Sequence, residues 1–214
     1  MESPFCRPDT RLIETFGWDS GAFRRLDAHL ARARASAAAL GFFWDESAIR
    51  AALGGVTGAA PLRVRLTIGR DGAAEVTTGP LAPTPPLWRL TLAKDRLPPN
   101  DPRLRHKTTE RALYDATRAA LPEGTDEALF LNTRGEAAEG TITNLFFDLG
   151  AGMRTPPLAC GCLPGILRAE LLAAGRVQEA VLTEANLPRA RLWMGNALRG
   201  LIPATLVEAA PDLG

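Results

Sequence analysis

The segment Glu139-Gly-Thr-Ile-Thr-Asn-Leu-Phe-Phe147, read together with Lys107 upstream, decides how this chain is interpreted. A carboxylate stands directly before an apolar run of the kind that forms a buried strand. Lys107 is the second and last lysine of a chain that uses arginine almost everywhere else. Because arginine cannot lose its proton in a protein, a retained lysine indicates a need for an amine that can. Such an amine can form a Schiff base.

A fixed carboxylate complements a Schiff-base lysine for a chemical reason. The carbon bonded to the amine needs an electron sink. If that sink is a pyridine ring, the ring nitrogen has to stay protonated, and a carboxylate beside the nitrogen keeps the proton there. Lys107 and Glu139 therefore make pyridoxal 5'-phosphate (PLP) the leading cofactor hypothesis.

Candidate phosphate ligands complete this set of residues. A guanidinium fork suits a phosphate dianion, and so do the free amides at a helix N-terminus. Arg32, three residues after His29 in a predicted helix, is the guanidinium candidate, although a solvated helix arginine is its ordinary alternative. The amide candidates are Ile166 and Leu167, at the start of a helix in Leu163-Pro-Gly-Ile-Leu-Arg168, and Ala197 in Gly195-Asn196-Ala197.

Composition narrows the class of protein. The 214 residues suffice for one large domain or two small ones, and 25 basic against 24 acidic side chains leave a net charge of +1. This balance lacks the excess of basic residues typical of proteins that bind nucleic acid or an anionic membrane, so a small-molecule amino substrate is expected. No apolar run approaches the roughly 20 residues of a membrane span. Three cysteines and no signal-like start suggest a cytoplasmic protein.

The cysteines are not expected to carry chemistry. Cys160 and Cys162 are too close in sequence for an ordinary disulfide, and no histidine or second cysteine pair stands near them. No metal site is therefore predicted, and both thiols are interpreted as structural and inert.

The hydrophobic pattern predicts two α+β domains with a proline-rich linker at 81–86, the first domain being 1–80 and the second 87–214. Helices are expected at 26–41, at 46–53 after an Asp45 cap, at 108–121, and from Pro164 to about 174. Strands are expected at 11–18, 62–68, 74–78, 87–93, 127–132, 143–149, 178–183, 191–194 and 201–207.

Five segments in register resemble the class IV (fold-type IV) PLP enzymes over about residues 11–207. They are Glu14-Thr15 with Leu26-Asp-Ala-His-Leu-Ala-Arg32, Lys107-Thr-Thr-Glu-Arg-Ala-Leu-Tyr114, Glu139-Gly-Thr-Ile-Thr-Asn144, Leu163-Pro-Gly-Ile-Leu-Arg168 and Gly195-Asn-Ala-Leu-Arg-Gly200. The family contains branched-chain and D-amino acid aminotransferases and 4-amino-4-deoxychorismate lyases. The resemblance implies a small N-terminal α/β domain and a larger cofactor-binding domain with a mixed, barrel-like sheet.

The resemblance also implies roles for particular residues. Lys107 would be the Schiff-base lysine and proton shuttle, and Glu139 would pair with the pyridine nitrogen. The phosphate would be held by Arg32 and by the amides of Ile166, Leu167 and Ala197, with Asn196 nearby. Position 167 is leucine where many relatives have threonine, so only its amide could serve. Relatives are usually homodimers, and a homodimer is expected here.

Arginines are the candidates for binding the substrate carboxylate. They are Arg103, Arg105, Arg111 and Arg199, of which Arg199 stands beside a predicted phosphate loop. Solvent exposure is the ordinary alternative for each of them.

The reaction favoured by the resemblance is that of a lyase, which converts 4-amino-4-deoxychorismate to p-aminobenzoate and pyruvate in folate synthesis. Asn196-Ala-Leu resembles the lyases, and position 112 is alanine where branched-chain enzymes commonly have a tyrosine. Tyr114, the only tyrosine, is expected to point elsewhere on its helix. The alternatives are a branched-chain or D-amino acid aminotransferase, and a non-catalytic relative that binds a phosphate compound.

Overall fold

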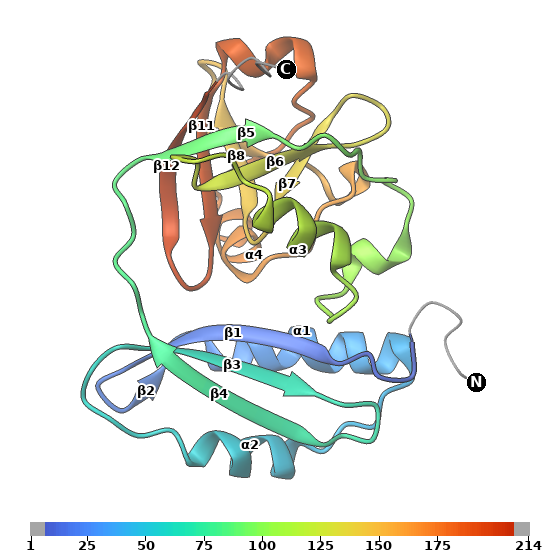
Figure 1. Ribbon diagram of the computed structural model, residues 1–214, viewed down its shortest axis with the longest axis vertical. Helices are drawn as coiled ribbons and strands as arrows, with labels where there is room; N and C mark the ends of the chain where they lie inside the picture. Colours follow the sequence, from blue (N-terminus) through green and yellow to red (C-terminus); the bar gives the residue numbers. More distant parts are fainter. Residues whose placement is uncertain (1–6, 208–214) are drawn as a thin grey trace. The chain divides into compact units, whose positions relative to one another are not determined.

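The computed structural model of the protein describes residues 7–207, which form two compact units (Figure 1). The first unit runs to Pro83 and takes in His106–Arg111. The second unit contains Thr84–Arg105 and the chain from Ala112 onward. The sequence predicts two continuous domains, 1–80 and 87–214, joined by a linker at 81–86. In the structure the first unit is discontinuous, because it also contains the short segment that carries Lys107.

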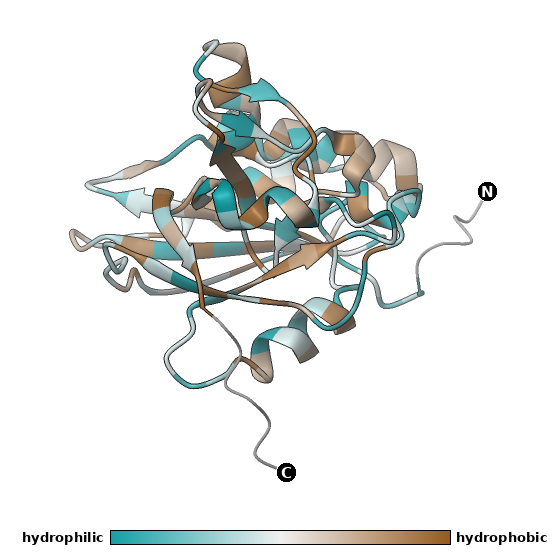
Figure 2. Ribbon diagram, turned by 90° about the horizontal axis from the view of Figure 1, so that it is seen from above, coloured by the Kyte–Doolittle hydropathy of each residue, from teal (hydrophilic) through white to brown (hydrophobic). Residues whose placement is uncertain are grey.

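The first unit is an antiparallel sheet in the order β2-β1-β3-β4, with two helices packed on one face. Its elements are β1 (Leu12–Asp19), β2 (Ala22–Phe23), α1 (Leu26–Leu40), α2 (Glu46–Gly54), β3 (Leu62–Ile68) and β4 (Ala74–Pro80). Hydrophobic and hydrophilic residues alternate along the ribbon (Figure 2), and the apolar sides of β1, β3 and the helices form one core. As the sequence predicts, Asp45 caps α2 by accepting a hydrogen bond from the Ala48 amide at 3.0 Å.

The second unit is built on a closed barrel. Its elements are β5 (Trp88–Leu92), η1 (Pro102–Arg105), α3 (Ala112–Ala119), β6 (Glu127–Leu131), β7 (Ala137–Gly140), β8 (Asn144–Asp148), β9 (Arg154–Thr155), η2 (Leu158–Cys160), α4 (Ile166–Ala173), β10 (Gln178–Glu179), η3 (Glu184–Arg189), β11 (Arg191–Asn196) and β12 (Gly200–Leu206). Hydrogen bonding follows the order β8-β11-β12-β5-β6-β7 and returns to β8. Strand β5 pairs in parallel with β12 and β6, and the other barrel pairs are antiparallel.

This architecture confirms the predicted fold class, an α+β protein with a separate antiparallel sheet and a mixed barrel. The barrel is filled by a cluster of leucine, phenylalanine, tryptophan, methionine and isoleucine side chains. Barrel closure removes the open sheet edge between β7 and β8.

Two local predictions were wrong, and strand β7 was not predicted. Helix α3 begins at Ala112 rather than at residue 108, because residues 107–109 pair with β1. Pro164 is not the first helical residue, since Gly165 is the N-cap of α4 and Ile166 begins it. Glu139 precedes the predicted strand that contains Asn144, which is β8, but it also lies within a strand that was not predicted, β7.

Glu127, at the start of β6, fixes the β7–β8 hairpin that carries Glu139. Its side chain is fully buried and accepts hydrogen bonds from both the amide and the hydroxyl of Thr141, at 2.9 and 2.5 Å. It also accepts from the Ile142 amide at 3.2 Å and the Thr143 hydroxyl at 2.9 Å. A buried carboxylate is tolerated only when donors surround it. Here the turn supplies most of them, and the Ala128 amide at 3.1 Å and Arg118 at 3.5 Å supply the others.

We expect Glu127→Gln to destabilise the protein by about 3 kcal/mol, because a carboxamide places an N–H group against donors that need an acceptor. For a chain of this size the loss lowers Tm by about 6–12 °C. Thermal unfolding of this variant beside the exposed control Glu123→Gln measures the effect. Equal Tm values for the two variants would show that the turn does not depend on Glu127.

Candidate active site

Lys107 is held in the first unit as an extension of its sheet. The Lys107 carbonyl accepts a hydrogen bond from the Ile13 amide at 2.8 Å, and the Thr109 amide donates to the Arg11 carbonyl at 2.9 Å. The Thr10 hydroxyl fastens the segment further by donating to Glu110 at 2.8 Å. The backbone at Lys107 is therefore fixed by β1 pairing, while its side chain is half-buried.

Arg32 belongs to a buried polar cluster on the helix-covered face of the same sheet. Glu14 points into this face between core residues of β1, and its side chain is 2% exposed. The Nε and Nη2 groups of Arg32 donate to its two oxygens at 2.9 and 2.6 Å, and His29 Nδ1 lies 2.6 Å from Oε2. Burial raises the pKa of the Glu14 carboxyl, but the Arg32 charge and the hydrogen bonds from His29 and Arg32 outweigh it, so this pKa lies below its usual value.

The same helix also contacts the lysine segment. Ser36 lies one turn after Arg32 on α1, and its hydroxyl is 3.0 Å from Nδ1 of His106, the residue before Lys107. Burial lowers the pKa of His106, so its neutral form is favoured. Helix α1 thus contacts both Glu14, through Arg32, and the segment that carries Lys107, through Ser36.

Glu139 is held at both carboxylate oxygens in the second unit. The hydroxyl of Tyr114, on α3, donates to Oε1 at 2.7 Å, and the amide of Leu163 donates to Oε2 at 2.9 Å. The residue is 6% exposed.

A single row across three strands links Glu139 to the α4 loop. Glu139 of β7 is opposite Asn144 of β8, which is opposite Gly195 of β11. The Asn144 side chain donates to the Leu163 carbonyl at 3.0 Å, so this cross-strand pair holds both polar groups of Leu163. A Cβ at Gly165 would lie 1.8 Å from Asn144 Oδ1, which explains why the loop needs glycine there.

The predicted amide donors gather at the other end of this row. Leu167 packs against Gly195 so closely that a Cβ on this glycine would lie 3.0 Å from Leu167 Cδ2. The first α4 amides, those of Ile166 and Leu167, come before the Ala169 amide, which donates to the Gly165 carbonyl at 2.9 Å. Amides of a first helical turn lack acceptors within their helix and attract anions. Gly195 is two strand spacings, about 10 Å, from Glu139.

Asn196 shapes the turn that presents Ala197. Its Oδ1 accepts hydrogen bonds from the amides of Leu198 and Arg199 at 3.1 and 2.9 Å, and its Nδ2 donates to the Ile142 carbonyl at 3.2 Å. Asn196 is thus an organiser of the β11–β12 turn next to Gly195, as well as a residue near the predicted phosphate site.

The arginines proposed for the substrate differ in their surroundings. Arg105 donates to the Cys162 carbonyl at 3.1 Å. The next residue, Leu163, is the one whose amide donates to Glu139. Arg199 donates to the Thr84 hydroxyl at 3.1 Å. Arg103 is exposed and forms a paired contact with Asp101. Arg105 therefore contacts the segment before α4 that also donates to Glu139.

The thiols of Cys160 and Cys162 are free and buried. Burial, with the charge of Glu136 adding to it, raises the pKa of Cys160 to about 11. Burial and the charge of Glu139 raise that of Cys162 to about 12. Reactive thiolates are therefore disfavoured at these two positions. Cys6 lies outside the described residues.

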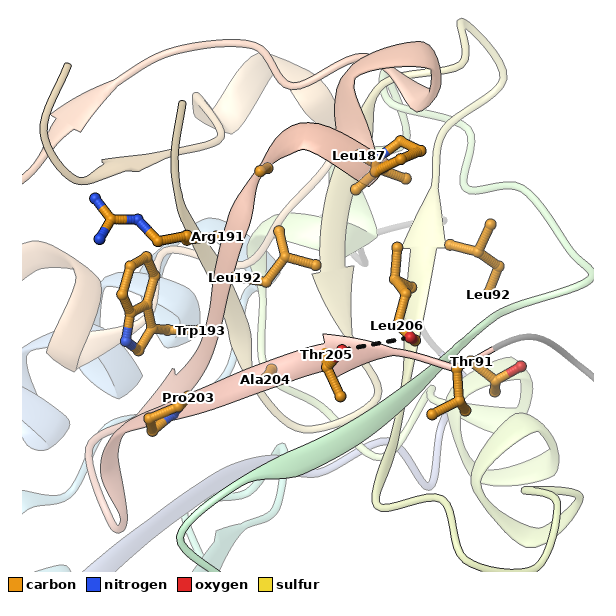
Figure 3. Close-up of a pocket in the computed structure, with 13 residues that line it drawn as sticks. Thr91, Leu92, Leu187, Arg191, Leu192, Trp193, Pro203, Ala204, Thr205 and Leu206 are labelled. Atoms are coloured by element: carbon orange, nitrogen blue, oxygen red, sulfur yellow. Dashed lines mark hydrogen bonds between the residues drawn. The ribbon is translucent and has the colours of Figure 1, made fainter. Parts of the chain in front are cut away.

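A separate groove of about 860 Å³ in the second unit is lined by β5, η3, β11 and β12 (Figure 3). Most of its lining residues are apolar, and its one charged lining residue, Arg191, pairs with Asp148 at 2.5 Å. None of the predicted site residues lines it. Because it lacks converging polar groups, this groove is not the candidate active site.

Two other kinds of site are not found in residues 7–207. Over that range, no helix has the length and apolar character needed to cross a lipid bilayer. Nor do histidine, cysteine, aspartate and glutamate side chains of the same range gather into a group able to hold a metal ion.

Sequence comparison agrees with the fold and the motifs. The model of the amino-transferase class IV family matches residues 11–207. The chain therefore belongs to this family of enzymes. A comparison with curated proteins finds no match.

Solved structures extend the comparison. A "Putative amino-acid aminotransferase" from Mesorhizobium loti is 46% identical, with 93% of this chain and 100% of that chain covered and a TM-score of 0.87. A "Putative 4-amino-4-deoxychorismate lyase" is 27% identical, with 95% and 86% covered and a TM-score of 0.77. The branched-chain amino acid aminotransferase of Escherichia coli is 21% identical, with 94% and 77% covered and a TM-score of 0.74, a likeness that shows the fold alone.

Tyr114 is the site residue that sequence reasoning missed. It was expected to point elsewhere on its helix, but its hydroxyl contacts the carboxylate predicted to hold the pyridine nitrogen. Tyr114 packs against Phe130 of β6, and Phe130 is paired with Glu139 of β7, so the two side chains meet. A lone tyrosine seven positions after the lysine was the available signal.

We expect Glu14→Gln to reduce the free energy of unfolding by about 3 kcal/mol at neutral pH, because Arg32 would lose its buried partner charge. The folded pKa of Glu14 is lowered, so its contribution is complete above the ordinary carboxyl pKa and is lost as pH falls through the folded value. The difference between variant and wild type should therefore shrink in acid.

Urea unfolding at neutral and acid pH measures this difference. Glu75→Gln is the control, since that side chain is 68% exposed in its pair with Arg11 and should change stability little. A Glu14→Gln loss that is the same at both pH values would contradict the assigned pairing.

Proposed function

We propose that the protein is a PLP-dependent enzyme acting on a small amino substrate. The observation that carries the proposal is the Glu139 carboxylate, which is buried and held at both oxygens by donors from α3 and from the loop before α4. It lies in one row with Gly195, against which the first turn of α4 packs. A carboxylate and an anion-binding helix start at opposite ends of a short row suit a heterocycle that carries a phosphate.

The residues present fit this cofactor. Glu139 would accept a hydrogen bond from the protonated ring nitrogen. The phosphate would be held by the amides of Ile166, Leu167 and Ala197, with Asn196 shaping the turn. Arg32 would add its guanidinium, whose orientation is fixed by Glu14. Lys107 would bind the cofactor covalently. When bound, PLP supplies an aldehyde that captures amines and a ring that accepts electron density.

The other steps are assigned to side chains of the protein. The Lys107 amine removes the proton from the amine-bearing carbon of the substrate and returns a proton later in the reaction. Glu139 keeps the ring nitrogen protonated throughout. Arg105, or Arg199, holds a substrate carboxylate.

The reaction we propose is the conversion of 4-amino-4-deoxychorismate to p-aminobenzoate and pyruvate. Ala112, the Asn196-Ala-Leu run and the 27% identical lyase-named structure support it. An amino acid aminotransferase is the second candidate, favoured by the 46% identical relative from Mesorhizobium loti. Both share the proton removal assigned to Lys107. We further propose a homodimer, which light scattering of the purified protein can test.

An activity assay separates the two reactions. We expect the PLP-loaded protein to release p-aminobenzoate from 4-amino-4-deoxychorismate, measured by fluorescence after chromatography. The same preparation is then given branched-chain and D-amino acids with 2-oxoglutarate. Turnover of amino acids alone would replace the lyase with the aminotransferase. No turnover and no PLP uptake would favour a non-catalytic phosphate-binding relative.

We expect Lys107→Ala to abolish turnover and the visible colour of lysine-bound PLP, because no other amine replaces it. Stability should change little, since a half-buried lysine adds little to the core. The matched control is Lys94→Ala, which removes the other, exposed lysine and should leave colour and turnover unchanged. Absorption spectra before and after borohydride reduction give the readout. Colour that survives in Lys107→Ala and disappears in Lys94→Ala would reverse the assignment.

A further inference from the structure

Tyr114 contacts the carboxylate on which the proposed chemistry depends. Its hydroxyl donates to Glu139 Oε1 at 2.7 Å, and the Leu163 amide occupies the other oxygen. The tyrosine ring packs edge-on against Phe130, with centroids 5.1 Å apart and planes at 67°. Phe130 is the β6 residue directly opposite Glu139. The ring contact thus fixes the position from which the hydroxyl reaches the carboxylate.

We propose that Tyr114 is a positioning residue that keeps Glu139 ionised and oriented, and through it keeps the proton on the cofactor's ring nitrogen. This inference rests on the proposed function. It assigns Tyr114 no contact with substrate or cofactor.

The reason is the proton balance of a buried acid–base pair. A ring nitrogen and a carboxylate can share one proton as an ion pair or as a neutral pair. A hydrogen bond donated to the carboxylate favours its charged form, and so favours the ion pair with the proton on nitrogen. The effect is large where water is scarce, and Glu139 is 6% exposed. A bond to a charged group alters such a balance by about tenfold or more.

The substitution Tyr114→Phe isolates the hydroxyl, because phenylalanine retains the ring that packs on Phe130. We expect this variant to fold and to take up PLP. Its bound cofactor should show an altered pH titration of absorbance, and kcat should fall about tenfold while KM changes little.

A double-mutant cycle with Glu139→Gln tests whether Tyr114 acts through the carboxylate. Position 139 has no ionisable group in that background, so adding Tyr114→Phe should change neither the titration nor kcat further. A purely structural contribution of the hydroxyl would slow both backgrounds equally.

The outcomes separate the two claims. If the wild-type protein takes up no PLP, the proposed function fails. If the wild type takes up PLP and Tyr114→Phe matches it in titration and kcat, the inference about Tyr114 is wrong while the proposed function stands. Loss of folding in Tyr114→Phe, or equal slowing in the Glu139→Gln background, would also overturn the inference by assigning Tyr114 a structural role.

Discussion

A carboxylate buried on the outside of the barrel sets the main constraint on the second unit. A desolvated charge is expensive unless donors compensate it, and Glu139 obtains its donors from two distant segments, α3 through Tyr114 and the α4 loop through Leu163. The hairpin beneath it depends in turn on a second buried carboxylate, Glu127, which holds the β7–β8 turn. The position of Glu139 is therefore linked to the β7–β8 pairing that closes the barrel, to the loop before α4 and to the placement of α3.

The first unit also buries a carboxylate and surrounds it with hydrogen-bond donors. Glu14 lies on the apolar face of β1 and is compensated by Arg32 and His29 of α1. This pairing orders a guanidinium that would otherwise be a flexible helix side chain, and a fork held in advance loses less entropy when it binds an anion. The start of the same strand, just before Glu14, pairs with the lysine segment, so β1 positions both Arg32 and the backbone of Lys107.

Local patterns were sufficient to predict most helices, most strands and the Asp45 cap, because hydrophobic period and capping chemistry are properties of neighbouring residues. They failed where pairing is long-range. The strand character of residues 137–140 depends on β6 and β8, and the extended backbone at Lys107 depends on β1. For the site, residue types indicated Lys107, Glu139 and the α4 amides. The contact of Tyr114 with Glu139 could not be predicted, since it depends on how α3 packs against β6 and β7.

The central claim is that Glu139 holds a proton on the ring nitrogen of bound PLP. Nitrogen-15 NMR of the enzyme loaded with ring-labelled PLP tests it most directly, because the ring nitrogen shift differs between the protonated and unprotonated states. We expect a protonated nitrogen at neutral pH in the wild type and an unprotonated one in Glu139→Gln. An unprotonated nitrogen in the wild type, or an unchanged shift in Glu139→Gln, would contradict the account.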